Sequence, residues 1–376
     1  MRRRASLNIP VLFLVLFALA LSPPAAAKKK SKKAKAQRHF VIDTDLSVTY
    51  DDNILNYSDA DLDLFANDLG GGKFAIQSKD DWIIVPEIRA GYQGLGLRGK
   101  AASLILGYRY YGYANNDVRR YSRIWLVARQ YVVAGGYAQL SIGYIPSYYY
   151  RNLLFKPPGS TSSIFMEAKF SKPSLAVEFG YDIRQNLKGS AAYIYQHKSF
   201  QKEFEYRDLN THGFDLEAIW RAADIIKLWG AYGFEFAGAR GADMADTIQD
   251  VSYNAWDMTV GARYYSKFLK SQAPELVTSF KFRRINYQTG RRPDLFRRHL
   301  FYYGRNDNNY DLKFGTACRM PWELRLELGY EFAQKKADLP DEYPSLVRNI
   351  PETTAQLESR LNYKSNSYTL RISRQF

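Results

Sequence analysis

The four histidines, His39, His197, His212 and His299, are the side chains of this sequence best suited to acid–base chemistry. A hydrolytic site would need a histidine base beside a nucleophile and an orienting carboxylate or amide. His39 belongs to a basic N-terminal segment and His299 to an arginine-rich stretch, which leaves His197 and His212 as candidates. Neither stands in a recognisable catalytic motif, so histidines exposed to solvent or at an interface are the favoured interpretation. We predict that the protein is not an enzyme.

The sequence contains few residues that could form a metal or redox site. Cys318 is the single cysteine, so it can form no intramolecular disulfide and no cysteine-based metal site. Asp51, Asp52 and Asn53 could form a cluster of oxygen ligands, but no third acidic ligand follows at the spacing of a calcium loop. We interpret these three residues as turn formers whose side chains bond the backbone. The sequence predicts no cofactor and no metal site.

Basic residues suggest a different chemistry. Guanidinium groups bind phosphate and carboxylate with two parallel hydrogen bonds. One stretch of the sequence is crowded with such groups and contains Arg283, Arg284, Arg291, Arg292, Arg297, Arg298, His299 and Arg305. The favoured interpretation is contact with the phosphates of a lipid surface. A basic vestibule that attracts anionic solutes or polymers is the second interpretation. The residues predicted to make this contact are Arg291, Arg292, Arg297, Arg298 and Arg305.

The formal net charge of +15 is concentrated at the N-terminus. Residues 1–38 hold ten basic residues and no acidic residue, which leaves +5 for residues 39–376. The lysine-rich run from Lys28 to Lys35 is therefore expected to be a solvated tail that touches anionic lipid at most. We expect no nucleic-acid binding, because no folded element accompanies this run.

The N-terminus has the residue order of a secretory signal peptide. Arginines at positions 2–4 precede an apolar run from Val11 to Leu21, and small residues follow at 25–27. This run is too short to span a bilayer as a helix, and no later window reaches roughly eighteen apolar residues. We predict a signal peptide at 1–27, a basic periplasmic tail at 28–38 and one folded domain at 39–376.

Alternation of apolar and polar residues recurs in segments of about ten residues, which is typical of transmembrane β-barrel strands. Leu104, Leu106 and Tyr108, for example, oppose Gly107 and Arg109. A charge in the middle of such a strand is costly against lipid, so it should face the interior. The basic residues predicted to line the interior are Arg89, Arg109, Arg123, Arg129, Arg263, Lys281, Arg283, Arg325 and Arg371. Glutamates share this face at 87, 327 and 331, so a mixed lining with weak selectivity is expected.

A final strand with a single apolar face supports this architecture. Tyr368, Leu370, Ile372 and Phe376 share that face, and such a strand leaves no free edge if it closes a barrel. The pattern resembles the C-terminal assembly signal of bacterial outer-membrane barrels, from which it departs at Arg374. The resemblance implies recognition by the barrel-assembly machinery. The phosphates bound by the arginine cluster would then be those of lipopolysaccharide. Aromatic residues make up 15% of the chain, as expected for girdles at the membrane interfaces.

We predict an all-β transmembrane antiparallel barrel of about sixteen strands, with fourteen to eighteen open. A secreted antiparallel sandwich would also alternate, but it would not explain the final strand and the aromatic content. Two assignments conflict with an even strand count. Pro173 either divides the segment 163–184 or lies within one long strand, and a short turn at Ser365–Ser367 after a long connection at 335–352 would reverse the last strand.

Three segments of the first third of the chain resemble the β-barrel porin 2 group of outer-membrane proteins. They are Tyr50-Asp51-Asp52-Asn53-Ile54, Ile84-Val85-Pro86-Glu87-Ile88 and Tyr108-Arg109-Tyr110-Tyr111-Gly112-Tyr113. The resemblance implies an outer-membrane barrel of undefined substrate, in a group linked to envelope or exopolysaccharide traffic.

These observations lead to a functional prediction with one alternative. We predict a passive outer-membrane channel, porin-like or an export pore, for small or anionic solutes or polysaccharide. The alternative is a non-conducting barrel that is plugged by its loops or that sheathes another envelope component. The expected partners are outer-membrane lipid, lipopolysaccharide, the barrel-assembly machinery and envelope or polysaccharide-export proteins.

Overall fold

The computed structural model describes residues 40–242, 250–266, 274–289, 302–341 and 353–376. In these residues, period-two alternation gives each strand one apolar and one polar face, and fourteen antiparallel strands result. The strands are β1 (Phe40–Asp51), β2 (Asp81–Leu95), β3 (Ala101–Tyr113), β4 (Tyr121–Val133), β5 (Gly136–Phe155), β6 (Ile164–Arg184), β7 (Leu187–Phe200), β8 (Leu209–Ala223), β9 (Ile226–Ala239), β10 (Tyr253–Tyr265), β11 (Glu275–Tyr287), β12 (Asn306–Arg319), β13 (Leu324–Asp338) and β14 (Tyr363–Gln375).

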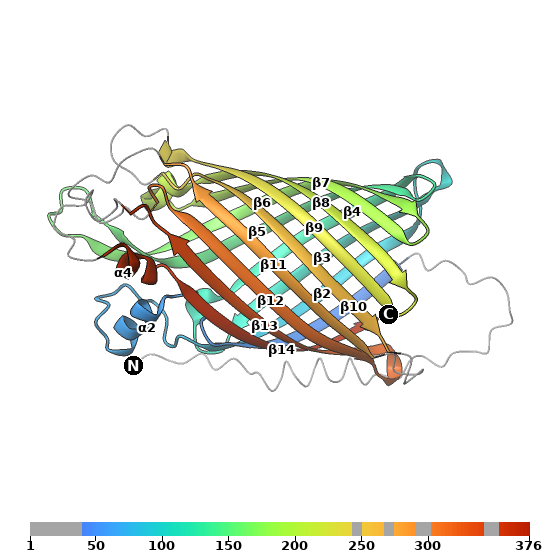
Figure 1. Cartoon of the computed structure of the whole chain (residues 1–376), viewed down its shortest axis with the longest axis horizontal. Coiled ribbons are helices and arrows are strands. Elements are labelled where there is room, and N and C mark those ends of the chain that lie inside the picture. The colour runs from blue at the N-terminus through green and yellow to red at the C-terminus, as the bar shows by residue number, and fades with distance from the viewer. Residues whose placement is uncertain (1–39, 243–249, 267–273, 290–301, 342–352) are drawn as a thin grey trace.

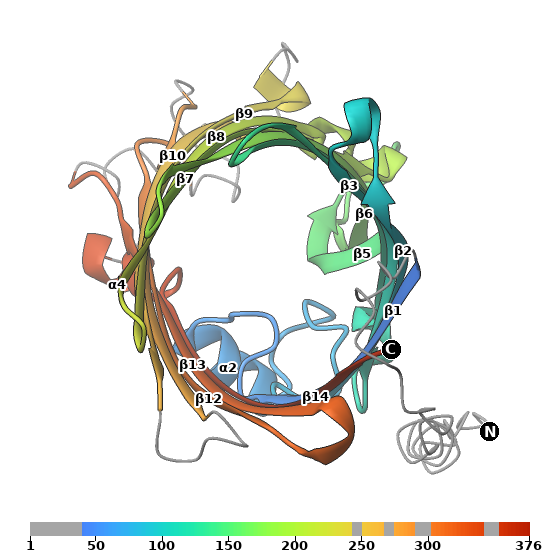
Figure 2. The same cartoon turned by 90° about the vertical axis from the view of Figure 1, so that its right-hand side faces the viewer.

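Each strand pairs with its neighbours in the sequence, and β14 also pairs with β1, which closes the sheet (Figures 1 and 2). Along this seam Val48 lies opposite Leu370, and the hydroxyls of Thr49 and Thr369 are 2.8 Å apart. A closed sheet has no unpaired edge. The structure therefore confirms the predicted closed all-β barrel, at the lower end of the predicted range of strand number.

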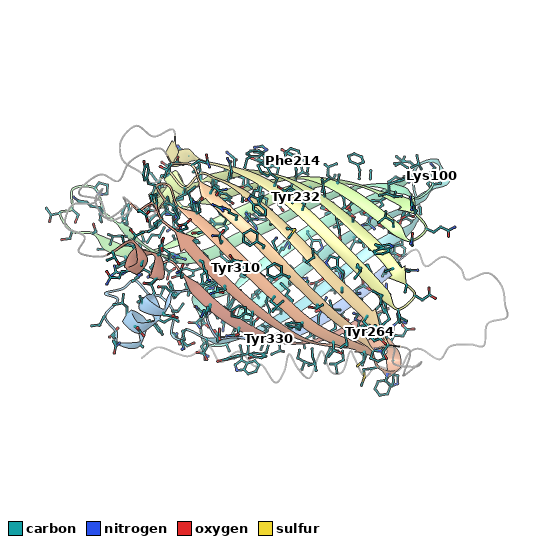
Figure 3. The ribbon with its side chains drawn as sticks, in the orientation of Figure 1. Lys100, Phe214, Tyr232, Tyr264, Tyr310 and Tyr330 are labelled. Carbon is teal, nitrogen blue, oxygen red and sulfur yellow. The ribbon has the colours of Figure 1, made fainter. Side chains whose placement is uncertain are left out.

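The outer face of the barrel is apolar. On β3, Leu104, Leu106 and Tyr108 are 47%, 54% and 44% exposed and alternate with inward-facing residues. Phe214 and Tyr232 likewise lie on the outside of the wall (Figure 3). Large exposed apolar side chains around a closed sheet match the lipid-facing band of a membrane barrel.

The connections differ in length at the two ends of the barrel (Figure 1). At one end they occupy 96–100, 134–135, 185–186, 224–225, 266–274 and 320–323, and all of these except 266–274 are shorter than every connection at the other end. At the opposite end, hereafter the mouth, lie the connections 52–80, 114–120, 156–163, 201–208, 240–252, 288–305 and 339–362. This asymmetry resembles the short periplasmic turns and longer outer loops of bacterial barrels.

Two structural details resolve the conflict in strand count. Pro173 lies inside β6 and pairs with Tyr144 of β5, at a position where the pairing with β7 is interrupted, so its missing N–H is tolerated. The turn predicted at Ser365–Ser367 is wrong, because these residues belong to β14. The last long connection is 339–362, and β14 therefore runs away from the mouth.

Helices in the described residues are short. Two are α-helical, α2 (Asp59–Ala66) and α4 (Thr354–Ser359), and both lie in connections at the mouth. Five are 3-10 helices, η1 (Leu97–Gly99), η2 (Asp117–Arg119), η3 (Lys202–Arg207), η4 (Arg240–Ala242) and η5 (Pro321–Glu323). Among the described residues, no helix has the length and apolar character needed to cross a membrane.

Candidate functional site

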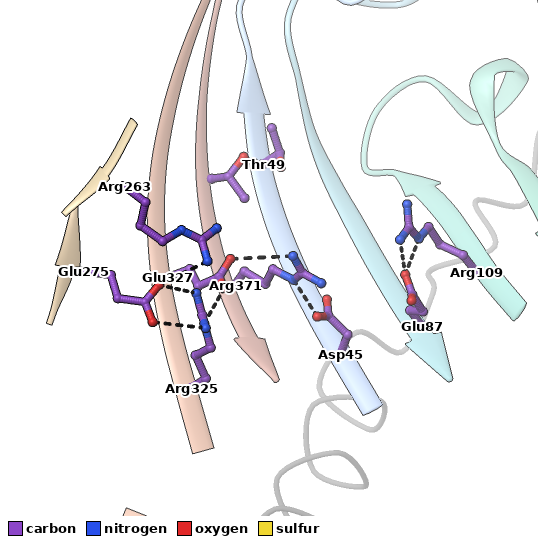
Figure 4. A network of polar contacts seen from close by, with 10 residues as sticks. Asp45, Thr49, Glu87, Arg109, Arg263, Glu275, Arg325, Glu327 and Arg371 are labelled. Atoms are coloured by element: carbon purple, nitrogen blue, oxygen red, sulfur yellow. Dashed lines mark hydrogen bonds and ion pairs between the residues drawn. The ribbon is translucent and has the colours of Figure 1, made fainter. Parts of the chain in front are cut away.

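The inner wall of the barrel carries chains of ion pairs, because each charged residue alternates with an outward-facing apolar neighbour. One chain runs along β10, β11, β13, β14 and β1 (Figure 4). Its members are Arg263, Glu275, Arg325, Glu327, Arg371 and Asp45. Glu275 on β11 reaches Arg325 on β13 at 3.1 Å, across the intervening β12. A contact that skips a strand is favoured on the concave face, where side chains converge.

Two further groups of charges are paired in the same way. Arg109 binds Glu87, which also lies 3.3 Å from Arg89. On the opposite part of the wall, Arg283 contacts Glu235 at 3.0 Å, and Lys281 contacts Asp257 at 3.1 Å. Seven of the nine predicted lining residues are thus ion-paired, namely Arg89, Arg109, Arg263, Lys281, Arg283, Arg325 and Arg371. Local pairing cancels most of the charge that the sequence places on this face.

The other two predicted residues, Arg123 and Arg129, lie on the inner face of β4. Arg129 Nε donates a hydrogen bond to Gln139 Oε1 at 2.8 Å. Lys172 on β6 and Lys198 on β7 were not predicted, yet they lie on the same arc, and Lys172 is repelled by both Lys198 and Arg123. In the described part of the chain, Arg123, Lys172 and Lys198 have no carboxylate within ion-pair distance.

The connection 52–80 packs inside the mouth of the barrel. Its residues Ile54, Tyr57 and Ile76 form a buried cluster with Tyr113 of β3 and Tyr149 of β5. Tyr149 is only 2% exposed. The view along the axis shows α2 of this connection within the outline of the barrel (Figure 2). The packing of apolar and aromatic side chains narrows the passage at this end.

Polar side chains fasten this connection to the wall. The Asn116 side-chain oxygen accepts a hydrogen bond from Gln77 N at 2.7 Å, and its amide donates to Asp81 Oδ2 at 2.8 Å. Arg119 donates to the carbonyls of Tyr149 and Ile54 at 3.0 and 3.1 Å. Both Asn116 and Arg119 are buried, so these hydrogen bonds hold the connection in one position.

Asp51, Asp52 and Asn53 join the end of β1 to β14. Asp52 accepts hydrogen bonds from the backbone and side-chain amides of Asn366, both at 2.7 Å. Asp51 accepts from Ser365 Oγ at 3.0 Å and from Asn53 N at 2.9 Å. The predicted bonding of the backbone is present, and these residues also fix the closing seam of the barrel.

A cavity of about 260 Å³ lies in the mouth, between the connection 52–80 and the wall. Five tyrosines line it, together with five basic and two acidic side chains. The lining residues are Asn56, Tyr57, Ser58, Asp61, Tyr150, Arg151, Leu153, Leu154, Tyr206, Arg207, Tyr287, Tyr302, Arg305, Asp307, Lys335, Arg360 and Leu361. The excess of three positive charges makes this cavity electropositive.

Aromatic rings hold the basic groups of the cavity in place. The Arg151 guanidinium lies 4.9 Å from the Tyr150 ring centre and 5.8 Å from that of Tyr57. Arg207 donates to the Tyr302 hydroxyl at 3.1 Å. Burial raises the pKa of the Tyr57 hydroxyl to about 12, although the positive charge of Arg151 opposes this shift. The Tyr57 hydroxyl therefore stays protonated and can donate a hydrogen bond.

Of the five residues predicted to contact lipopolysaccharide, the structure describes only Arg305. Arg291, Arg292, Arg297 and Arg298 lie outside the described residues. Arg305 is only 6% exposed, binds Asp307 at 2.6 Å and lines the cavity, so a contact with lipopolysaccharide on the outer surface does not fit its position. The predicted signal peptide and the tail at 28–38 also lie outside the described residues.

The remaining predicted residues are exposed on the outer face. Tyr368, Leu370, Ile372 and Phe376 are all more than a third exposed. His197 and His212 are close neighbours, and each forms a hydrogen bond on the barrel surface, His197 to Asn210 and His212 to Tyr193, both at 2.8 Å. Tyr57, Tyr150, Arg151 and Arg207 of the cavity are not among the residues predicted from the sequence. The run of three tyrosines at 148–150, followed directly by Arg151, is a local signal that could have found part of it.

Together, the apolar exterior and the ionised interior define a transmembrane β-barrel. No family model matches the chain, and no curated protein sequence matches it, so the resemblance to the β-barrel porin 2 group stays a prediction. Solved structures of similar shape include a bacterial polysaccharide outer membrane secretin, with 8% identity over 89% of this chain and 98% of that chain and a TM-score of 0.46.

Two other structures show a comparable likeness. The outer membrane channel DcaP of Acinetobacter baumannii is 11% identical over 91% of this chain and 99% of its own, with a TM-score of 0.44. An anion-selective porin from Comamonas acidovorans is 10% identical over 90% of this chain and 98% of its own, with a TM-score of 0.41. At such low identity and TM-score, these likenesses assign no function to this chain.

Proposed function

We propose that this chain is an outer-membrane channel through which small polar solutes pass passively, anions in preference to cations. The observation that carries the proposal is the division of the wall into two faces. Strand β3 presents Leu104, Leu106 and Tyr108 outwards and Arg109 inwards, opposite the inward-facing Arg123 of β4. An apolar exterior suits lipid, and an ionised interior suits water.

The exposure of the ion pairs supports a hydrated lumen. The side chains of Arg109, Arg325 and Arg371 remain 31%, 32% and 37% exposed although each is paired. Barrels of about eight strands are filled by side chains, whereas those of about sixteen to eighteen enclose an aqueous channel. A fourteen-stranded barrel with partly exposed inner charges is closer to the second kind.

The preference for anions rests on the charges that have no local counter-charge. The mouth cavity has an excess of basic groups, and the arc that holds Arg123, Lys172 and Lys198 continues it into the barrel. In the described residues, Asp215 on β8 and Asp311 on β12 form no ion pair either, but Lys281 and Arg283 interact electrostatically with both. A solute that enters through the mouth would therefore first meet the unpaired basic groups, which favour anions.

The finer assignments belong to the same proposal. An anionic polymer, such as an acidic polysaccharide, would meet the same basic arc as a small anion. Outer-membrane lipid, lipopolysaccharide and the barrel-assembly machinery are the partners that a bacterial barrel of this kind would need.

A plugged, non-conducting scaffold is the second candidate, and one observation favours it. The connection 52–80 packs within the mouth through a buried aromatic cluster and buried hydrogen bonds of Asn116 and Arg119. If this packing closes the passage, the ionised interior would hold water without conducting. A conductance measurement separates the two candidates.

We expect the purified, heat-modifiable protein to show single-channel steps in a planar bilayer, with a reversal potential in a KCl gradient that indicates anion preference. Replacing Lys172→Glu and Lys198→Glu should shift the reversal potential towards cations, because lumen charges tune selectivity. Lys364→Glu is the control, since Lys364 is exposed outside the lumen, and it should leave the value unchanged. Absence of conductance from folded protein would favour the scaffold, and a cation preference in the wild type would refute the proposed selectivity.

A further inference from the structure

Two buried polar atoms at the mouth cavity have no hydrogen-bond partner in the described part of the chain. They are the hydroxyl oxygen of Tyr57 and Nε of Arg151. Both residues line the cavity. Buried polar groups are almost always satisfied, and an unsatisfied charged group is costly. Two such atoms at one cavity point to a ligand that accepts hydrogen bonds.

The carboxylates of the cavity are already engaged by other cations. Asp61 binds Lys73 at 2.5 Å, and Asp307 binds Arg305 at 2.6 Å and lies 3.8 Å from Lys335. Arg151, by contrast, forms no ion pair with a carboxylate in the described part of the chain, and its guanidinium lies over the rings of Tyr57 and Tyr150. Its guanidinium can therefore accept an external anion without breaking an ion pair.

We propose that this cavity binds a small organic oxyanion, a carboxylate or a phosphate carried on a ring, with Arg151 as the main anchor. The inference rests on the proposed function, because it names the class of solute that the channel selects at its mouth. A guanidinium binds either oxyanion through parallel hydrogen bonds. The Tyr57 hydroxyl would donate a further bond, and the other tyrosines present faces and hydroxyls to the ring that carries the anion.

The size and position of the cavity fit this role. Its volume of about 260 Å³ is near the lower end of ligand pockets, which run from about 300 to 1,000 Å³, so it suits a single small molecule. Lys198 of β7 and Lys172 of β6 lie on the inner wall beyond the cavity, and their positive charges repel each other. An anion that leaves the cavity would thus meet a succession of basic groups along the inner wall.

The test is equilibrium binding to the full-length folded protein in detergent, measured by calorimetry with glucuronate, glucose 6-phosphate, inorganic phosphate and neutral glucose. We expect both charged sugars to bind saturably, inorganic phosphate to bind more weakly, and glucose not to bind. Arg151→Gln should weaken binding by about tenfold or more, the usual loss for a hydrogen bond to a charged group. Arg151→Lys keeps the charge and should recover part of the affinity.

Arg240→Gln is the matched control, because Arg240 lies at the same end but is exposed and pairs with Glu205 at 3.0 Å. It should bind as the wild type does. If Arg151→Gln does not fold, Tyr57→Phe removes only the unpartnered hydroxyl and should weaken binding several-fold. The preference between glucuronate and glucose 6-phosphate distinguishes a carboxylate site from a phosphate site.

Absence of binding by either charged sugar, or wild-type affinity in both the Arg151→Gln and Tyr57→Phe variants, would overturn the inference. Inorganic phosphate binding as tightly as glucose 6-phosphate would refute the role of the tyrosines. The channel itself is judged separately. Conductance without binding would leave the channel standing and remove this site, whereas binding without conductance would keep the site and remove the channel.

Discussion

At the scale of single residues, the lumen of this barrel is organised by carboxylates that are shared between arginines. Glu275 is 6% exposed and lies 3.1 Å from Arg325 and 3.5 Å from Arg263. Two guanidinium groups this close to one carboxylate would otherwise repel each other in a partly desolvated setting. The shared glutamate is what allows the wall to carry closely spaced arginines.

Glu275→Gln should therefore destabilise the barrel and, at the same time, increase the net positive charge of its inner wall. We expect a loss of about 1–3 kcal/mol in the free energy of unfolding, below the 3–5 kcal/mol typical of a fully buried pair, because both arginines are partly exposed. Urea titration followed by tryptophan fluorescence measures this loss. Glu323→Gln, in an exposed short turn, is the control and should change stability little. Equal stability of both variants would show that the shared pairing contributes nothing.

At the scale of elements, the connection 52–80 decides how wide the mouth is. Its apolar residues pack against β3 and β5, and Asn116 holds its C-terminal half through Gln77 and Asp81. Connections of this length in a barrel can extend into solvent, but here a buried aromatic cluster and buried amide bonds both favour the folded-in position.

Asn116→Ala should loosen this connection without unfolding the barrel. The substitution leaves the Gln77 amide without its acceptor, a cost of about 1–3 kcal/mol that falls on the connection alone. We expect trypsin cleavage at Lys73 to become about tenfold faster or more, and the single-channel current to become noisier. The neighbouring Asn115→Ala is the control, because the Asn115 side chain is exposed and only its backbone bonds Asp81. Similar cleavage rates in both variants would show that residues other than Asn116 hold the connection 52–80 in place.

At the scale of the whole molecule, closure of the sheet gives every strand the same division between lipid and lumen. Leu370 and Thr369 are consecutive in β14, yet Leu370 is exposed on the outer face, whereas Thr369 bonds Thr49 on the inner face. Leu370 therefore faces lipid and Thr369 faces the aqueous lumen. The same substitution should have opposite effects on assembly at the two positions.

Leu370→Arg should impair insertion and lower the amount of folded protein in the outer membrane, since arginine against lipid costs roughly 2–4 kcal/mol near the midplane. Thr369→Arg should assemble normally, because the lumen accepts charge. Heat-modifiable migration on gels, applied to isolated outer membranes, measures the folded fraction. Normal levels of Leu370→Arg would contradict the lipid-facing assignment and the prediction that this face serves as an assembly signal.

The sequence by itself determined the faces of the strands and hence the class of fold. Alternation is a local property, so Leu104 and Arg109 could be assigned to opposite faces without knowledge of their neighbours. The predicted turn forming by Asp51, Asp52 and Asn53 also followed from local chemistry. Local chemistry did not reveal that Asn366 is the partner of Asp52, which is why the polar run 365–367 was misread as a turn.

Only the tertiary structure decided which charges cancel and where a binding cavity forms. The pairing of Glu275 with Arg325 depends on the register of three strands, and register is set by closure of the whole sheet. The cavity brings Tyr57, Arg151 and Arg207 together from three separate elements. No local sequence pattern predicts that these three residues are close together, because their proximity arises when the connection 52–80 folds back against the inner wall of the closed barrel.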